Sequence, residues 1–376
     1  MQDNTLDDLA FHALVFDYLL AFEDLHILWR YRGPKPRSLG FKTRRWQDSL
    51  HVVKKTHPKG LDVGTEITHI DGLDIPAYAT KYAKRLRFNA PERQRFDDAL
   101  LFAEAITIKH DDRDETITLP RFEATTTPSN YQITHVEDKI LYLILSDFNN
   151  PDALIDLIEP YRPLLEDTPG WIIDVRDNNG GSDAAYQPFL PYFFNNGETL
   201  ESDEVYHLMS ERNCKLRKGL IRRYMDMSAN KPETRQMLEK FINDIDRFCG
   251  KGFVKTEPRD VRLFRHTYPN PRHVVILTDV ECASSGEQFV IDARQAAKVK
   301  VFGRPTLGVL DYSNLARINF DDVFDLWYPT SKVSTVKDGV FSKDGLVPDH
   351  YIPWTPRHLY EDEDIKQAVR YLKKVI

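Results

Sequence analysis

Four short apolar runs, each followed by polar or glycine residues, constrain the fold of this chain more than any other feature. They are rich in Val, Ile and Leu and occupy 140–145, 171–175, 274–278 and 299–303. Helical patterns fill parts of the intervals, at 152–165, where Pro160 should kink or shorten the helix, and at about 285–297. Buried strands that alternate with helices are typical of a largely parallel, covered sheet. The sequence therefore predicts an α/β fold from residue 131 onward.

A smaller β unit is expected before this sheet. Ile67 and Ile70 precede an Asp-Gly turn at 71–72, and a second short apolar stretch follows, which is typical of two paired strands. A helix is expected at about 92–105 and a hairpin at 106–119. These features predict a small domain over residues 48–122.

The two ends of the chain complete the predicted division. Apolar residues at helical spacing predict an amphipathic helix over residues 5–29, with Asp3 or Asn4 as its N-cap, within an N-terminal segment 1–47. Residues 123–376 form the predicted large domain, with a polar helical insert near 200–270.

Composition narrows the classes of function. The net charge of -7 argues against nucleic acid as the main partner. Three cysteines, an odd number at wide spacing, match neither a metal-site pattern nor a disulfide framework. No apolar stretch is long enough to span a bilayer. The compartment and the oligomeric state stay open.

Ser284 is the candidate nucleophile. It follows an apolar strand and a turn of small residues, directly before a predicted helix. Unpaired N–H groups and the helix dipole at such a junction stabilise the negative charge that develops when a serine attacks a carbonyl group. Serine is also a preferred helix N-cap, so this segment alone leaves both interpretations open.

A paired-glycine loop strengthens the catalytic interpretation. Gly180 and Gly181 follow the strand at 171–175, and glycines allow the backbone to approach a ligand closely with its N–H groups. A single glycine would usually satisfy a simple tight turn. The second glycine therefore favours a functional loop.

Taken together, these segments resemble the C-terminal processing (tail-specific) peptidase family of serine proteases. The family pattern Asp-Leu-Arg-x-Asn-x-Gly-Gly is matched at 174–181, and Ser-x-x-Glu is matched by Ser284 and Glu287. Residues 303–308 are similar to the family's Gly-x-x-Thr-x-Gly motif. Residues 344–349 resemble the Pro-Asp motif that ends the family's domain. The resemblance implies a crotonase-like catalytic domain of ββα units, and it identifies the unit at 48–122 as PDZ-like.

The same resemblance implies the roles of several residues. Ser284 would be the nucleophile, with oxyanion donors at the backbone of Ser285 and of Gly180 or Gly181. Many members use a lysine directly after Gly-x-x-Thr-x-Gly, but Val309 stands there in this chain. The branch that resembles the tricorn protease core instead uses a histidine before the PDZ-like domain, and the retinoid-binding relatives of the family keep the fold and bind small apolar ligands.

His26 matches that histidine, in Phe22-Glu23-Asp24-Leu25-His26. A neutral imidazole can accept the seryl proton near pH 7 and return it to the leaving group. The tricorn-like branch places a glutamate where this chain has Ser342, and Asp344 is the nearest acid that could substitute. Asp24 and Glu23 are sequence neighbours of the base. Ser342 could orient the imidazole but could not stabilise imidazolium as a carboxylate would.

Three functions follow as hypotheses. The first is a serine endopeptidase that cleaves peptides or unfolded proteins through an acyl-enzyme, without a metal or cofactor. The second is a catalytically impaired relative that binds a peptide or a small apolar ligand, because a fold does not fix a function. The third is a hydrolase of small esters or amides, which a peptide library compared with simple esters would separate from the first.

Overall fold

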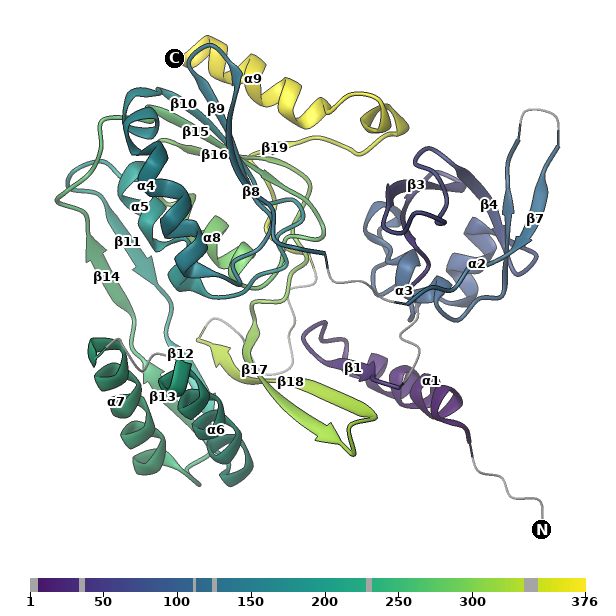
Figure 1. Cartoon of the computed structure of the whole chain (residues 1–376), viewed down its shortest axis with the longest axis horizontal. Helices are drawn as coiled ribbons and strands as arrows, with labels where there is room; N and C mark the ends of the chain where they lie inside the picture. Colours follow the sequence, from purple (N-terminus) through teal and green to yellow (C-terminus); the bar gives the residue numbers. More distant parts are fainter. Residues whose placement is uncertain (1–5, 34–37, 111–112, 124–126, 228–231, 335–343) are drawn as a thin grey trace.

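A computed structural model gives the structure of the chain and describes residues 6–33, 38–110, 113–123, 127–227, 232–334 and 344–376. In Figure 1 the large domain, with its central sheet, lies beside a smaller β unit, and helix α1 lies below that unit. Among the described residues, no helix combines the length and the hydrophobicity that crossing a membrane requires.

The central sheet has six strands in the order β19-β16-β15-β10-β9-β8. The strands are parallel except β8, which is antiparallel to β9. Their bounds are β8 (Tyr131–Glu137), β9 (Ile140–Leu145), β10 (Gly170–Asp174), β15 (His273–Thr278), β16 (Val299–Gly303) and β19 (His350–Tyr351). All four predicted apolar runs are therefore confirmed as neighbouring strands of one sheet.

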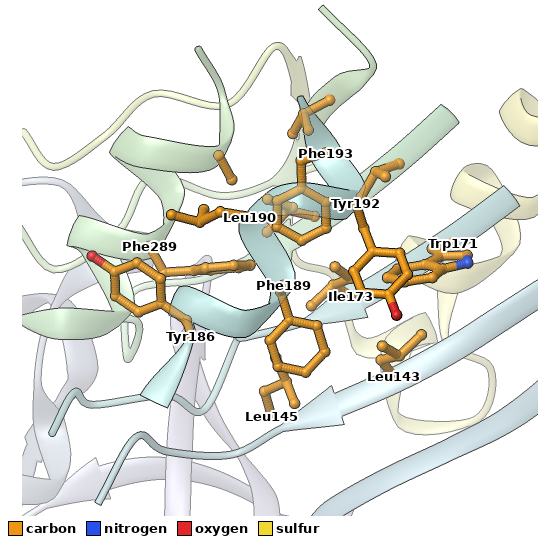
Figure 2. Packing of buried hydrophobic residues seen from close by; sticks show 14 of the residues in the cluster. Leu143, Leu145, Trp171, Ile173, Tyr186, Phe189, Leu190, Tyr192, Phe193 and Phe289 are labelled. Atoms are coloured by element: carbon orange, nitrogen blue, oxygen red, sulfur yellow. The ribbon is translucent and has the colours of Figure 1, made fainter. Parts of the chain in front are cut away.

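Helices cover both faces of this sheet, as the near-continuous apolar strands require. On one face, α4 (Pro151–Asp167), α5 (Leu190–Phe193) and α8 (Ser285–Ala293) contribute to a core rich in aromatic rings. Figure 2 shows part of this core, in which Tyr192 and Phe193 of α5 pack against Trp171 of β10. On the other face, α9 (Glu363–Val375) covers a smaller aliphatic cluster.

Two of the predicted helices differ in length. Helix α4 continues through Pro160 and ends at Asp167, so Pro160 does not shorten it. Leu154, Ile158 and Leu165 bury one face of α4 in the core, and this burial offsets the lost backbone hydrogen bonds. Helix α8 ends at Ala293, a turn earlier than expected.

The smaller unit has its own core and a sheet in the order β2-β3-β4-β6-β7, with β5 beside β4. The strands are β2 (Phe41–Trp46), β3 (Ser49–Lys55), β4 (Glu66–Ile70), β5 (Leu73–Asp74), β6 (Ala105–Ile108) and β7 (Glu115–Thr118). The predicted turn and hairpin are confirmed. Because β2 pairs with β3, the structure groups residues from about 39 with this unit, although the predicted division placed them in the segment 1–47.

The helix predicted at 92–105 is wrong. In this range the chain forms the end of a 3₁₀ turn (Pro91–Arg93) and the short helix α3 (Phe96–Leu100). Another helix, α2 (Ile75–Lys81), lies before the range. The segment cannot continue as a helix because Ala105 already belongs to β6, which pairs with both β4 and β7.

The N-terminal helix is also shorter than predicted. Helix α1 (Asp8–Leu19) is capped by the side chain of Asp7, and a 3₁₀ turn (Leu20–Phe22) ends at Glu23, whose φ of 57° is left-handed. The proposed caps Asp3 and Asn4 lie outside the described residues. Next comes β1 (Leu28–Tyr31), which pairs with β18 and therefore cannot belong to the helix.

The insert contains strands as well as helices. Helices α6 (Glu211–Met227) and α7 (Pro232–Phe248) form a hairpin with its own small apolar core, as Figure 1 shows at the lower left. The flanking strands are β11 (Thr199–Ser202), β12 (Val205–Leu208), β13 (Phe253–Glu257) and β14 (Asp260–Leu263). Strand β12 pairs with β18 (Phe324–Val333), which also pairs with β17 (Tyr312–Phe320) and β1.

Candidate active site

Ser284 lies in a strained turn between β15 and α8. Its φ of 52° and ψ of -125° are unusual for a residue that has a Cβ, and its side chain makes no capping hydrogen bond to the helix. The alternative that Ser284 is an ordinary N-cap therefore does not describe its geometry. Ser284 is half-buried at the N-terminus of α8, where the helix dipole favours negative charge.

The paired glycines pack directly against this turn. A Cβ on Gly180, whose φ is 104°, would lie 2.7 Å from the Ser284 Cβ, closer than atoms can approach. A Cβ on Gly181, whose φ is 144°, would lie 2.2 Å from the carbonyl carbon of Phe148. Both positions therefore need glycine, and the loop and the serine turn meet as the resemblance implied.

Asn178 holds the two turns together, a role that the sequence did not reveal. It is fully buried, and its Oδ1 accepts the Gly180 N–H at 3.0 Å. Its backbone carbonyl accepts the Ala283 N–H at 2.9 Å, and its Nδ2 donates to the Leu145 carbonyl. The sequence signal for this role was the Asn in the motif at 174–181, which is Asn178.

Ser285 differs from Ser284 in what its hydroxyl does. The Ser285 Oγ donates to the Gly181 carbonyl at 3.0 Å and so ties the glycine loop to α8. The Gly180 N–H is already engaged by Asn178. Within the described ranges, the N–H groups of Gly181 and Ser285 and the Ser284 hydroxyl make no hydrogen bond. These groups are therefore available to a substrate.

His26 is buried on the other side of the site. Its Nδ1 lies 2.5 Å from the carbonyl oxygen of Tyr312, the first residue of β17. A carbonyl can only accept, so Nδ1 carries the proton and Nε2 is left as an acceptor. Burial lowers the pKa of His26, while the Tyr312 carbonyl, the Glu287 carboxylate and the Val309 carbonyl counteract that effect.

Glu287 connects α8 to the loop that follows β16. Its buried carboxylate accepts hydrogen bonds from the Thr306 hydroxyl at 2.5 Å and from the N–H groups of Gly308 and Val309 at 2.7 and 3.0 Å. Burial raises the pKa of Glu287, and these three donors oppose that shift. Because the Val309 carbonyl also acts on the ring of His26, the loop at 306–309 connects helix α8, which follows Ser284, to the histidine.

The remaining candidate acids do not contact the imidazole. Asp24 accepts the backbone N–H of His26 at 2.8 Å, not a ring N–H, and burial raises its pKa to about 6. Asp344 is exposed, and its carbonyl accepts a hydrogen bond from Arg93. Ser342 lies outside the described residues. Within those residues, neither a carboxylate nor Ser284 hydrogen-bonds to the ring of His26.

The smaller unit contacts the catalytic loop through Arg93. Its guanidinium donates to the carbonyls of Thr306 at 2.8 Å, Leu307 at 3.1 Å and Asp344 at 2.6 Å. Beside this contact, a cleft of about 630 Å³ opens between the segment that contains His26, the smaller unit and the loop at 308–312. The cleft reaches the surroundings of His26 through Asp24, Val309 and Tyr312, whereas Ser284 is not among the described residues that line it.

Comparison with known proteins identifies the family. The sequence model of peptidase family S41 matches residues 139–352, more than half of the chain. The chain belongs to peptidase family S41. It is thus a serine-type peptidase of the C-terminal processing group, and the predicted family and activity class are confirmed. No curated protein matches the chain.

Solved structures show the same fold. The structure of mature CPAF aligns with a TM-score of 0.62 and 13% identity, over 100% of this chain and 88% of CPAF. A serine-to-alanine mutant of CPAF aligns with a TM-score of 0.65 and 12% identity, over 100% of this chain and 88% of the mutant. CPAF complexed with lactacystin aligns with a TM-score of 0.62 and 12% identity, over 100% of this chain and 89% of that chain. At this identity the likeness concerns the fold, and the predicted crotonase-like domain with a PDZ-like unit is confirmed.

Proposed function

We propose that this S41 peptidase is an endopeptidase that cleaves peptides or unfolded proteins through an acyl-enzyme on Ser284. The observation that carries the proposal is the Ser284 turn, whose hydroxyl and two neighbouring N–H groups form no hydrogen bond with any of the residues that the structure describes. A serine that only stabilised the helix would use its side chain as a cap.

The N–H groups of Gly181 and Ser285 are the proposed oxyanion donors. The sequence left open which glycine of the pair contributes, and the bond between Gly180 and Asn178 favours Gly181. Attack of the Ser284 Oγ on a peptide carbonyl forms the new C–O bond and places negative charge on the carbonyl oxygen. Donors already aimed at that oxygen need no reorganisation during the reaction.

His26 is the proposed general base. Its Nε2 takes the proton of the Ser284 hydroxyl during attack and gives it to the leaving amine when the C–N bond breaks. Water then attacks the acyl group with the same proton transfers and releases the acid product. Because the described residues place no hydrogen bond between His26 and Ser284, an approach of the two side chains on substrate binding is part of the proposal.

A backbone carbonyl replaces the third member of a serine triad in this proposal. The Tyr312 carbonyl orients the ring, and the Glu287 carboxylate supplies negative charge that raises the pKa of His26. A carbonyl stabilises imidazolium less than a carboxylate in direct contact, so we expect slower turnover than in a full triad. Ser342 and Asp344 stay candidates for a supporting role.

A fluorophosphonate probe tests the proposal. We expect stoichiometric labelling of the folded chain, loss of labelling in Ser284→Ala and weaker labelling in His26→Ala. A peptide library then tests for cleavage within peptides. An intact, folded protein that takes no label would contradict the proposal.

A non-catalytic binding function is the second candidate. The specific observation in its favour is that no carboxylate contacts the His26 ring in the described part of the chain. Under this alternative, the cleft beside the smaller unit would hold a peptide or an apolar ligand without cleavage. Retention of an intact peptide together with absent labelling would support it.

A further inference from the structure

Two cysteines that are far apart in the sequence meet at the base of the α6–α7 hairpin. Cys214 lies in the first turn of α6, and Cys249 directly follows α7. Cys249 packs against the apolar core that contains Cys214, and burial together with the neighbouring Cys249 thiol raises the pKa of Cys214. The sequence did not predict this pair, because the two cysteines come together only through the folding of α6 against α7.

Backbone hydrogen bonds hold the two thiols in this position. The Met209 N–H donates to the Gly252 carbonyl, and the Gly250 N–H donates to the Met209 carbonyl, each at 2.7 Å. The segments that enter and leave the hairpin are thus joined on both sides of the cysteines. Cys214 belongs to the apolar core between the helices, and Cys249 packs against that core.

The two thiols differ in accessibility, and this difference sets the order in which they would react, while the raised pKa of Cys214 makes it the less reactive of the two. Cys249 is half-exposed, whereas Cys214 is buried. Burial, together with the neighbouring Cys249, raises the pKa of the Cys214 thiol to about 11. An accessible thiol reacts first with an external oxidant, and a buried neighbour then resolves the product. The third cysteine, Cys282, is fully buried beneath the Ser284 turn.

We propose that Cys214 and Cys249 are an oxidisable pair that forms a disulfide across the base of the hairpin. The oxidant is a low-molecular-weight disulfide such as oxidised glutathione. The Cys249 thiol loses its proton and attacks one sulfur of the reagent, which forms a mixed disulfide and releases one reagent thiol. The Cys214 thiol then loses its proton and attacks the Cys249 sulfur, releasing the second thiol. The two cysteines are oxidised, and the reagent disulfide is reduced to two thiols.

The disulfide fastens the insert to the sheet that supports it. It closes a covalent loop that contains most of α6 and all of α7. A cross-link that closes a longer loop removes more conformational entropy from the unfolded chain. Strand β12, which leads into α6, pairs with β18, so the hairpin base is continuous with that sheet. The reaction does not involve Ser284 and is independent of the proposed peptidase mechanism.

Peptide mapping of the full chain tests the proposal. Wild-type protein and the Ser284→Ala variant, which avoids self-cleavage, are equilibrated in buffers of reduced and oxidised glutathione and then alkylated and digested. We expect one linked peptide that joins Cys214 to Cys249, with Cys282 alkylated only after unfolding. Cys249→Ser abolishes the linked peptide and leaves Cys214 as a free thiol, while Cys282→Ala, the matched control, leaves the link intact.

Several outcomes would overturn the proposal. One is folded protein in which Cys249 stays as a stable mixed disulfide with glutathione under strongly oxidising conditions. Links to Cys282, links between two copies of the chain, or the absence of any link would also contradict it. Hydrogen exchange provides a second readout, because oxidation should slow exchange in α6 and α7 at least severalfold in the wild type and leave Cys249→Ser unchanged. Equal exchange in both redox states would contradict the fastening role.

Discussion

The two halves of the candidate site are built in different ways. The serine half comes from loops after neighbouring parallel strands, β10 and β15, and close backbone contacts at Gly180 and Asn178 fix it. The histidine half comes from the N-terminal segment, and the carbonyl of Tyr312 at the start of a distant strand holds its ring.

The geometry of the serine half is fixed within one domain, whereas the geometry of the histidine half depends on contacts between units. The serine half needs only the central sheet, because loops after the carboxyl ends of parallel strands lie at one edge. The histidine half needs β1 to pair with β18 and Arg93 to contact the catalytic loop. We therefore expect the loss of either catalytic side chain to remove most of the activity, and changes in the contacts that position the histidine half to have smaller effects.

The largest expected effect is on the serine itself. Ser284→Ala should reduce kcat by a factor on the order of 10⁶, because the nucleophile is lost while the fold is kept. Ser285→Ala, the matched control, removes one hydrogen bond to the Gly181 carbonyl and should reduce kcat far less. Steady-state kinetics on a peptide substrate measures both. Equal losses in the two variants would mean that the assignment between the neighbouring serines is wrong.

Removing the proposed base should have the next largest effect. His26→Ala should lower kcat by a factor on the order of 10³ to 10⁴, because Ser284 then has no group to accept its proton. His57→Ala is a suitable control, because His57 lies in the smaller unit and packs on Phe122. A loss below tenfold in His26→Ala, with the protein folded, would reject His26 as the base.

The glycine loop offers a sharper test of backbone fit. Gly180→Ala should lower kcat roughly 10²- to 10³-fold, because the new methyl group collides with Ser284 and displaces the proposed oxyanion donors. Gly219 in α6 has open space around the position of a Cβ. Gly219→Ala should therefore keep activity and raise the free energy of unfolding by about 0.5–1 kcal/mol. Kinetics and chemical denaturation of both variants check this contrast.

Arg93 tests the contact between the two units. Arg93→Ala leaves the three carbonyls of Thr306, Leu307 and Asp344 without this donor, and we expect kcat to fall about tenfold, or ~1.4 kcal/mol. Lys54→Ala removes an exposed ion pair with Asp177 across the same two units. Exposed pairs are worth about 0–1 kcal/mol, so kcat should stay unchanged. A loss as large in Lys54→Ala would show that general weakening of the interface is the cause.

The pH profile is the finest probe of the histidine half. The base must be neutral, and burial lowers the pKa of His26 below its usual value of about 6.5. Activity should therefore fall as pH falls through that lowered pKa, and kcat/KM at pH 6.5 should exceed half of its plateau. An acid limb with a midpoint above pH 7 would contradict this environment.

The sequence predicted the serine half well for a physical reason. The apolar runs at 140–145 and 171–175 have the length and composition of buried strands, and the glycine pair marks a close backbone approach that the structure contains. Local sequence also located the Asp-Gly turn before β5, because turn chemistry acts over a few residues.

The histidine half could not be read in the same way. No local signal in the sequence indicates that the Tyr312 carbonyl would meet His26, because a backbone acceptor has no side-chain signature. The predicted helix at 5–29 extended over residues that pair with β18, since long-range pairing overrides helical spacing. The sequence did not indicate the role of Arg93 for a related reason, because the carbonyls of Thr306, Leu307 and Asp344 are more than two hundred residues away along the chain.

The most direct test of Ser284 as the nucleophile is the position of a fluorophosphonate label, determined by peptide mass mapping. We expect the phosphonyl group on Ser284 of the wild-type chain and no modification of Ser285. Label on Ser285, or a folded chain that stays unlabelled while a known serine peptidase reacts in the same tube, would contradict the assignment.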